Sequence, residues 1–263
     1  MIVLKIGGSI SGEYSSDLIE DLRQHLTKGV VIVHGGGRVV NELSSKIGIE
    51  QKFYQSVSGF KTRLTDKETL DLIKMVFAGK INKEIVSLLS QFGGKAIGLG
   101  GKDGQLIIAR KCKDKNLGLV GEIEHINSTL IDLLEKEGFI SVVAPVGVSR
   151  EGETLNINAD IAAAEIAGSL KAEKLIFLTD VEGILEDPSD EKTLISSLTI
   201  EQTENMLRKE KIQRGMIAKV RACQIALKKG VSKVHIISGK ISHCLLYTSP
   251  SPRDLSTSRM PSS

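Results

Sequence analysis

Apolar residues occur along the chain in short continuous runs, separated by longer segments with helical periodicity. Seven runs predict buried strands, at residues 2–6, 30–34, 96–101, 106–110, 140–148, 174–181 and 233–238. Continuous apolar runs are typical of strands that are covered on both faces. Helices are predicted at residues 16–28, 38–47, 66–91, 127–137, 159–170, 199–209 and 216–229. This alternation predicts an α/β fold, a three-layer αβα sandwich around a mainly parallel open sheet.

Composition narrows the classes of function. The chain has 263 residues, of which 41% are hydrophobic and 25% charged, as in ordinary globular proteins. Its net charge is only +3 and aromatic residues make up 3%, so a nucleic-acid partner is not expected. No apolar run approaches the roughly 20 residues that cross a bilayer, so no membrane contact is expected either.

Cysteine usage and the start of the chain indicate the cytoplasm. Cys112, Cys223 and Cys244 are few and widely spaced, which fits neither a disulfide framework nor a metal site. The first residues predict a strand and a glycine turn, not a signal peptide. We therefore expect a cytoplasmic protein without a metal site of its own.

Residues 247–263 break the alternating pattern. They contain three of the 5 prolines and six serines, with almost no core-forming residues. Such a composition is typical of disorder. We expect this tail to be disordered, or foreign to the rest of the chain.

Three glycine clusters follow predicted strands, at Gly7–Gly8, Gly35–Gly37 and residues 98–104. The carboxyl ends of parallel strands share one edge, where ligands bind, so the clusters suggest that backbone N–H groups approach an anion there. Tight turns alone are the alternative explanation for each cluster. The Walker A pattern and the GxGxxG fingerprint with its acidic partner are both absent, which leaves the two common types of nucleotide site unsupported.

Two lysines stand where a lysine is unusual. Lys5 lies inside a predicted buried strand, so its charge needs a partner or a ligand unless that strand is an exposed edge. Lys219 falls in the first turn of the predicted helix 216–229, where the helix dipole disfavours a positive charge. A solvated lysine is the alternative interpretation of Lys219.

Polar residues also gather at 156–160 and 179–183. Asn156 and Asn158 can donate amide hydrogens, and Asp160 stands at a predicted helix start, where its charge is favoured. Simple helix capping is the alternative for Asn158 and Asp160. Residues 179–183 end another buried strand with polar groups, either for a ligand or as an ordinary turn.

Together these motifs resemble the amino acid kinase family, and within it the acetylglutamate kinases most closely. The matching segments occur in the family's order over residues 1–243: KIGGS (5–9), VIVHGGG (31–37), TRLTDKETL (62–70), GLGGKDG (98–104), GETLNINAD (152–160), LIFLTDVEGIL (175–185), GMIAKV (215–220) and VHIISG (234–239). The resemblance implies the amino acid kinase fold. It also implies phosphoryl transfer from ATP, with Mg²⁺ carried by the nucleotide, to the side-chain carboxylate of N-acetyl-L-glutamate. The product would be N-acetyl-L-glutamyl 5-phosphate, in the second step of L-arginine biosynthesis.

The resemblance assigns roles residue by residue. The implied catalytic residues are Lys5, Asp160 and Lys219. The implied substrate-binding residues are Gly36, Gly37, Arg63, Asn156 and Asn158. The implied ATP-binding residues are Gly7, Gly8, Thr179, Asp180, Gly183 and Gly215. Residues 1–170 would form an N-terminal lobe for the acceptor and for dimerisation, residues 171–246 would form the ATP lobe, and a homodimer is expected.

Two departures from the family pattern keep alternatives open. SGFKTRLT (58–65) is longer and more basic than the usual link before the arginine. It is similar to kinases that phosphorylate aminoadipate or glutamate attached to a carrier protein, and such a kinase is the first alternative. The tail also replaces an expected leucine-rich end. A catalytically silent nucleotide-binding protein of the same fold is therefore the second alternative.

Overall fold

Strands and helices alternate along the chain, as the apolar pattern predicts. The structure, a computed structural model, describes residues 1–7, 29–55, 61–181, 183–187, 190, 193–209, 212 and 214–239. The strands are β1 (Ile2–Ile6), β2 (Val30–His34), β3 (Phe53–Gln55), β4 (Lys61–Arg63), β5 (Ala96–Gly100), β6 (Ile107–Lys111), β7 (Gly121–Ile126), β8 (Ile140–Ala144), β9 (Val146–Val148), β10 (Thr154–Asn156), β11 (Lys174–Thr179) and β12 (Lys233–Ser238). The helices are α2 (Gly37–Ile47), α3 (Lys67–Lys74), the π-helical η2 (Met75–Ile81), α4 (Asn82–Gln91), α5 (Thr129–Lys136), α6 (Ala159–Ser169), α7 (Ile200–Arg208) and α8 (Arg214–Lys228), with short 3₁₀ turns η3 (Asp103–Gln105) and η4 (Lys115–Leu117).

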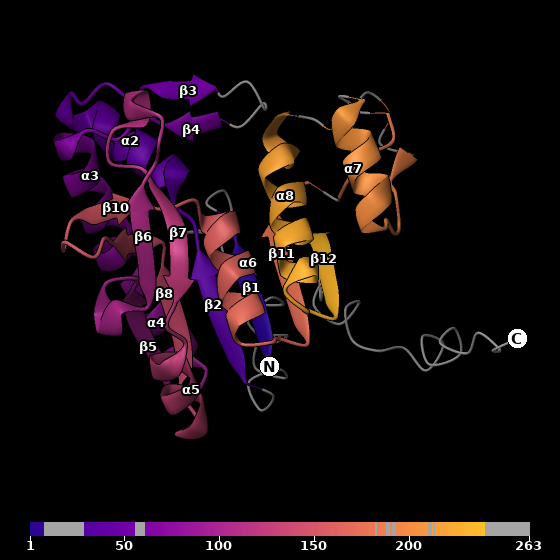
Figure 1. Cartoon of the computed structure of the whole chain (residues 1–263). Helices are drawn as coiled ribbons and strands as arrows, with labels where there is room; N and C mark the ends of the chain where they lie inside the picture. The colour runs from indigo at the N-terminus through magenta and orange to yellow at the C-terminus, as the bar shows by residue number, and fades with distance from the viewer. Residues whose placement is uncertain are drawn as a thin grey trace, which may run out of the picture.

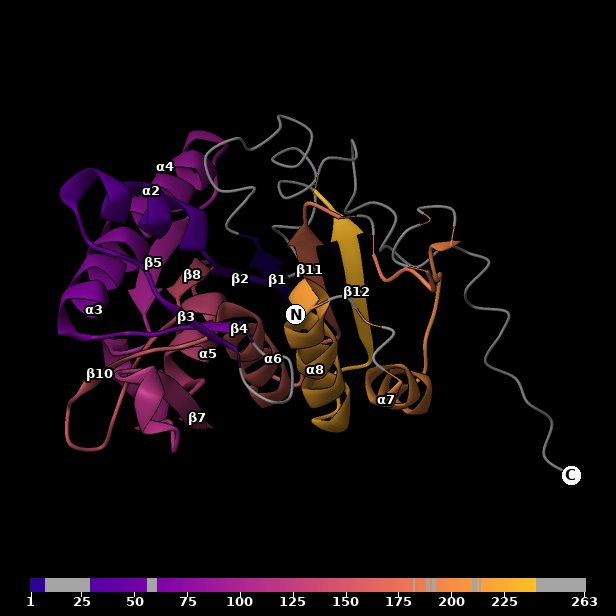
Figure 2. The same ribbon diagram turned by 90° about the horizontal axis from the view of Figure 1, so that it is seen from above.

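The centre of the molecule is a parallel sheet between two layers of helices (Figure 1). Its strand order is β12-β11-β1-β2-β8-β5, and every neighbouring pair is parallel. Figure 2 shows α2 and α4 on one side of this row of strands and α6 and α8 on the other. The predicted three-layer α/β fold is therefore confirmed.

Alternation along β1 decides which side chains meet which helical layer. Ile2, Leu4 and Ile6 pack in one core with α2 and the helical run from α3 to α4. Val3 packs in the other core with α6 and α8, and Lys5 contacts α6 on that same side. Since β1 lies between β11 and β2, Lys5 is on a central strand, and it is only 5% exposed.

A second sheet departs from the predicted single layer of strands. Its order is β10-β9-β6-β7, antiparallel except between β6 and β9. The predicted strand 106–110 belongs to this sheet as β6. The predicted strand 140–148 is divided between the two sheets, with Pro145 at the break. Proline has no N–H to donate to a ladder, which favours the end of β8 at this point.

Some elements carry too little pattern to be predicted. β3, β4 and β10 are only three residues long, and β7 exposes several positions, so none shows a clear apolar period. The predicted helix 66–91 is present as one helical run, but η2 forms its middle. The predicted helix 16–28 and the tail 247–263 lie outside the described residues.

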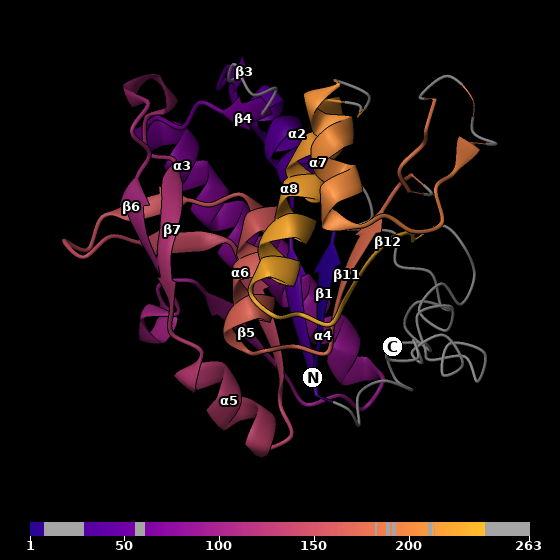
Figure 3. The same ribbon diagram turned by 45° about the vertical axis from the view of Figure 1, so that its right-hand side comes forward.

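The central sheet continues across the predicted lobe boundary at residue 170. β5, β8, β2 and β1 precede this residue, whereas β11 and β12 follow it. α6 and α8 lie side by side in front of the sheet (Figure 3). The carboxyl ends of the parallel strands meet at one edge, and that edge holds the candidate site.

Candidate active site

Lys5, Asp160 and Lys219 meet where β1, the first turn of α6 and α8 come together. Lys5 Nζ lies 2.6 Å from Asp160 Oδ1, and Lys219 Nζ lies 3.2 Å from Asp160 Oδ2. The side chains of Lys5 and Asp160 are 6% and 9% exposed, and that of Lys219 is 16% exposed. The three predicted catalytic residues are thus brought together by three separate elements.

One carboxylate between two ammonium groups leaves a net positive charge in this cluster. Burial alone would raise the pKa of Asp160, but the charges of Lys5 and Lys219 outweigh it and hold this pKa below its ordinary value. Burial lowers the pKa of Lys5, and Asp160 opposes that shift. Asp160 also lies in the first turn of α6, where the helix dipole favours a negative charge. The cluster therefore suits an anion that arrives beside the two lysines.

A cleft of about 650 Å³ opens beside this cluster. The predicted residues that line it are Lys5, Gly36, Gly37, Arg63, Asn156, Asn158 and Asp160. They come from β1, α2, β4, β10 and α6, which are distant from one another in the sequence. The structure therefore brings the predicted acceptor residues and two of the predicted catalytic residues into one cavity.

The glycine turn before α2 forms part of the cleft wall. Gly36 is the N-cap of α2, no side chain caps this helix, and its first turn holds no acidic residue. Free N–H groups at a helix start attract anions. A Cβ on Gly36 would lie 2.3 Å from Ile81 Cδ1 and 2.9 Å from Phe77 Cε1. Its φ of 165° is ordinary extended backbone, so close packing behind the turn is what requires glycine here.

Arg63 stands on the wall formed by β3 and β4. Its Nη2 donates to Gly37 O at 3.1 Å, its Nη1 donates to Gln51 Oε1, and its Cζ lies 4.7 Å from the centre of the Phe53 ring. Burial lowers the pKa of Arg63 to about 10, so the guanidinium is still charged at neutral pH. These partners are all uncharged, which leaves its positive charge available to an acidic ligand.

Asn156 and Asn158 differ in the hydrogen bonds that their side chains already make. Asn156 Nδ2 donates to Thr65 Oγ1 at 3.0 Å. Asn158 is the N-cap of α6, and its Oδ1 accepts from the backbone N–H groups of Asp160 at 2.9 Å and Ile161 at 3.1 Å. The capping alternative is therefore confirmed for Asn158, although this residue also lines the cleft.

The predicted ATP residues near the ends of β1 and β11 lie beyond the cleft. Gly7 N donates to Leu178 O at 3.0 Å, which ties the end of β1 to β11. Thr179 Oγ1 donates to Asp180 Oδ1 at 3.1 Å. Gly8 lies outside the described residues. Gly7, Thr179 and Asp180 therefore lie at the carboxyl edge of the sheet, as the strand pattern predicts.

The start of α8 corrects one argument from the sequence. The helix begins at Arg214, with Gly215 in its first turn, so Lys219 lies in the second turn and not the first. The helix dipole falls off within the first turn, and it does not explain Lys219; the contact with Asp160 does. Elsewhere in the predicted ATP set, a Cβ on Gly183 would lie 2.9 Å from Leu194 Cδ1, a tight approach within its own loop.

The third glycine cluster, 98–104, lies away from the cleft, and two of its glycines are closely packed. β5 is at the edge of the sheet, separated from β2 by β8, and none of these glycines lines the cleft. A Cβ on Gly98 would lie 1.8 Å from Asn82 Oδ1, and one on Gly101 would lie 2.5 Å from Val146 O. Close packing therefore accounts for Gly98 and Gly101, and the prediction that this cluster approaches an anion stays a prediction.

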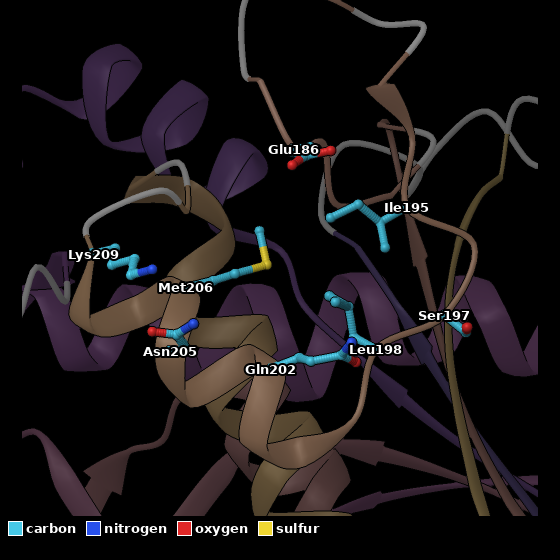
Figure 4. A pocket seen from close by; sticks show the side chains of 8 residues that line it. All are labelled: Glu186, Ile195, Ser197, Leu198, Gln202, Asn205, Met206 and Lys209. Atoms are coloured by element: carbon cyan, nitrogen blue, oxygen red, sulfur yellow. The ribbon is translucent and has the colours of Figure 1, made fainter.

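A smaller pocket of about 320 Å³ lies between α7 and residues 186 and 195–198. Its lining includes Gln202, Asn205 and Met206 on α7 and Ile195 and Leu198 from the segment before α7 (Figure 4). Of the residues predicted to bind ATP, none that the structure describes lines this pocket. It is therefore separate from those described residues.

Phe53, Lys61 and Arg221 also line the cleft but were not predicted as site residues. Lys61 Nζ lies 4.7 Å from the centre of the Phe53 ring, as Arg63 Cζ does. The spacing of Lys61 and Arg63 could have predicted that both line the cleft, because residues two apart in a strand share a face. Arg221 reaches the cleft from α8, and no local pattern indicates that.

No described helix is long and apolar enough to cross a membrane. Within the part of the chain that the structure describes, no group of three or more His, Cys, Asp or Glu side chains could hold a metal ion.

Comparison with known proteins agrees with this fold. The profile of the amino acid kinase family matches residues 1–238. An acetylglutamate kinase of Methanococcus maripaludis (strain C5) is 49% identical over 226 residues, which covers 82% of this chain and 75% of the relative. One from Halothermothrix orenii is 45% identical over 252 residues, covering 93% and 85%. The crystal structure of smu.665 from Streptococcus mutans UA159 superposes with a TM-score of 0.81 at 31% identity, covering 90% and 94%. This chain belongs to the amino acid kinase family.

Proposed function

We propose that this chain is an acetylglutamate kinase, which phosphorylates the side-chain carboxylate of N-acetyl-L-glutamate with ATP in L-arginine biosynthesis. The observation that carries the proposal is the net positive cluster of Lys5, Asp160 and Lys219 beside a cleft that also holds the charged Arg63. The similarity to two acetylglutamate kinases, each at 45% identity or more over most of this chain, supports the same acceptor.

The proposed reaction needs no general base. An oxygen of the acceptor carboxylate attacks the γ-phosphorus of ATP, so that a new O–P bond forms. The bond from that phosphorus to the bridging oxygen breaks, and ADP leaves with the electron pair. A carboxylate is already ionised at neutral pH, so no proton has to be removed. Catalysis then rests on positioning and on stabilising the transferring charge.

The two lysines fit the second of these tasks. The ammonium groups of Lys5 and Lys219 contact the two different carboxylate oxygens of Asp160, at 2.6 Å and 3.2 Å. Fixed positive groups in a site shielded from water stabilise developing negative charge more effectively than water does. Asp160 would orient both ammonium groups, while one net positive charge remains for the phosphoryl group.

The cleft offers groups for both carboxylates of the acceptor. Arg63 has a planar fork that suits the free α-carboxylate. The start of α2, at Gly36 and Gly37, offers N–H groups for the reacting carboxylate. Asn156 and Asn158 would hold the rest of the molecule, which includes a neutral amide. In this arrangement the cleft selects an acceptor with two acids, separated by a short apolar chain.

On the nucleotide side, residues 171–246 are proposed as the ATP lobe, with Gly7, Gly8, Thr179, Asp180, Gly183 and Gly215 as its binding residues. Mg²⁺ is proposed to arrive on the phosphates of ATP. Mg²⁺ bound in this way needs only one or two protein carboxylates, and Asp180 at the end of β11 is one such group. Residues 1–170 are proposed to hold the acceptor and the dimer interface.

Hydroxylamine trapping tests the proposed acceptor, because it converts an acyl phosphate into a stable hydroxamate. We expect hydroxamate from ATP, Mg²⁺ and N-acetyl-L-glutamate, and none from L-glutamate or L-aspartate. Product formed only with carrier-linked aminoadipate or glutamate would overturn the proposed acceptor. Absence of product with every acceptor, together with measurable ATP binding, would instead favour a silent nucleotide-binding protein.

A further inference from the structure

Behind the cleft, buried hydrogen bonds link the helical run 67–91 to the glycine turn before α2. His34 ends β2 and is 0% exposed, and Asn82 begins α4 and is 1% exposed. His34 Nδ1 lies 2.9 Å from Gly35 O, and His34 Nε2 lies 3.3 Å from Asn82 Nδ2. Asn82 Nδ2 also donates to Val142 O on β8 at 2.9 Å. The turn is therefore connected to two other elements of the core.

Chemistry determines which nitrogen of His34 donates a hydrogen bond and which accepts one. A carbonyl oxygen only accepts, so His34 Nδ1 must carry the proton that it donates to Gly35 O. His34 Nε2 then has a free lone pair, which accepts from the Asn82 amide. Burial lowers the pKa of His34 to about 4, so the ring is neutral at neutral pH and one tautomer satisfies both contacts.

This chain of bonds orients the next N–H group. The carbonyl of Gly35 and the N–H of Gly36 belong to one trans peptide unit, in which they point in opposite directions. His34 holds the carbonyl toward the core, so the Gly36 N–H is directed away from the core. Gly36 lines the cleft, and its N–H therefore faces the space proposed for the reacting carboxylate.

The π-helical segment η2 supports the same turn. A π-helical turn is wider than an α-helical one, and such turns are frequent at functional sites. Phe77, within η2, meets the His34 ring edge-on with centroids 6.3 Å apart. Phe77 and Ile81 occupy the space where a side chain on Gly36 would lie. Asn82 follows η2 directly, so one short segment provides both the packing and the hydrogen bond.

Gly98 makes room for Asn82. A Cβ on Gly98 would lie only 1.8 Å from Asn82 Oδ1. The amide of Asn82 could not keep its position beside such a methyl group. One glycine of the cluster that does not line the cleft thus serves the turn indirectly.

We propose that Asn82 and His34 are positioning residues for the phosphoryl acceptor: Asn82 orients the His34 ring, and His34 holds the Gly35 peptide so that the Gly36 N–H faces the acceptor carboxylate. The inference rests on the proposed function, since it assigns the turn before α2 to N-acetyl-L-glutamate.

Gly98→Ala tests the proposal without removing any hydrogen-bonding group. The added methyl displaces the Asn82 amide, and we expect the KM for N-acetyl-L-glutamate to rise by about 10-fold, as for the loss of one hydrogen bond. The KM for ATP should change by less than about 2-fold, since the turn is proposed to hold the acceptor and not the nucleotide. Gly100→Ala is the matched control on the same strand, because its new Cβ would meet its nearest atom, Asp103 Oδ2, at 3.8 Å. An unchanged acceptor KM in folded Gly98→Ala, or an equal rise for both substrates, overturns the proposal.

A pair of His34 variants gives a second readout if Gly98→Ala does not fold. An asparagine amide can reach the place of Nδ1 and still donate to Gly35 O, whereas a glutamine amide reaches the place of Nε2. We therefore expect His34→Asn to retain a lower acceptor KM than His34→Gln, although both lose packing. Equal acceptor KM values for the two variants contradict the proposal. If the wild-type chain gives no hydroxamate with N-acetyl-L-glutamate, the proposed function fails first, which is a different outcome.

Discussion

Lys5 and Asp160 form a buried ion pair between the central strand β1 and the first turn of α6, with 2.6 Å between Nζ and Oδ1. Lys219 reaches the other oxygen of the same carboxylate from α8, at 3.2 Å, and is the more exposed of the two lysines. Removal of one partner of a buried pair leaves an uncompensated charge and is strongly destabilising. Lys5 and Asp160 thus support the fold as well as the site, whereas Lys219 can be replaced while Asp160 keeps its buried partner.

Lys219→Ala should lower kcat by ~100-fold or more, because one charge-stabilising group is lost. The melting temperature should change little, since Lys5 still compensates Asp160. Steady-state kinetics with saturating ATP and N-acetyl-L-glutamate measures the effect. Lys228→Ala is the control on the same helix, because Lys228 is exposed and pairs with Glu204. An unchanged kcat for Lys219→Ala would remove this residue from the mechanism.

Asp160→Asn should move the alkaline limb of the kcat profile to lower pH. Burial and the charge of Lys219 both lower the pKa of Lys5, and Asp160 opposes them. Without that carboxylate the pKa of Lys5 falls further, so the protonated ammonium is lost at a lower pH than in the wild type. Measuring kcat of both proteins at a series of rising pH values compares the two alkaline limbs. A limb that stays in place or moves to higher pH would show that the ionisation of Lys5 does not limit the rate.

Arg63→Ala should chiefly raise the KM for N-acetyl-L-glutamate, since the uncompensated guanidinium is proposed to bind its α-carboxylate. A hydrogen bond to a charged group contributes about 1.5–3 kcal/mol, which corresponds to a rise of about 10- to 150-fold. Arg150→Ala is a suitable control, because Arg150 is exposed and pairs with Glu124 away from the cleft. An effect confined to the KM for ATP would contradict the assignment.

His34 should make the fold sensitive to acid. Its pKa is lowered from 6.5 to about 4 in the folded chain, mainly by burial. Between these values the unfolded chain binds more protons than the folded one, so the free energy of unfolding falls as the pH drops below about 6.5. The full loss is about 3 kcal/mol near pH 4, and about 2 kcal/mol is lost by pH 5. Denaturant unfolding at pH 7 and pH 5 should show a smaller difference for His34→Gln than for the wild type. Equal differences would mean that His34 does not set this dependence.

Much of the fold follows from local patterns. Continuous apolar runs predicted the strands of the central sheet, because burial on both faces leaves a direct mark on composition. The prediction of a single strand over 140–148 was wrong, because at Pro145 the chain passes from one sheet to the other without a change in hydrophobicity. β3 and β4 were not predicted, because strands of three residues are too short to show a period.

Within the site, local patterns drew attention to Lys5, because it lies in a buried strand, and to the glycine turn that contains Gly36. The roles of Asp160 and Lys219 were implied by the family resemblance. The distances between them were not accessible in this way. They depend on which strands are neighbours in β12-β11-β1-β2-β8-β5 and on how α6 packs beside α8, and no local pattern encodes either. The same holds for His34, Asn82 and Gly98, whose connection exists only once η2 packs behind the glycine turn. Local sequence thus determines the type of each element and the chemistry available to it, whereas long-range packing decides which groups come within a hydrogen bond of one another.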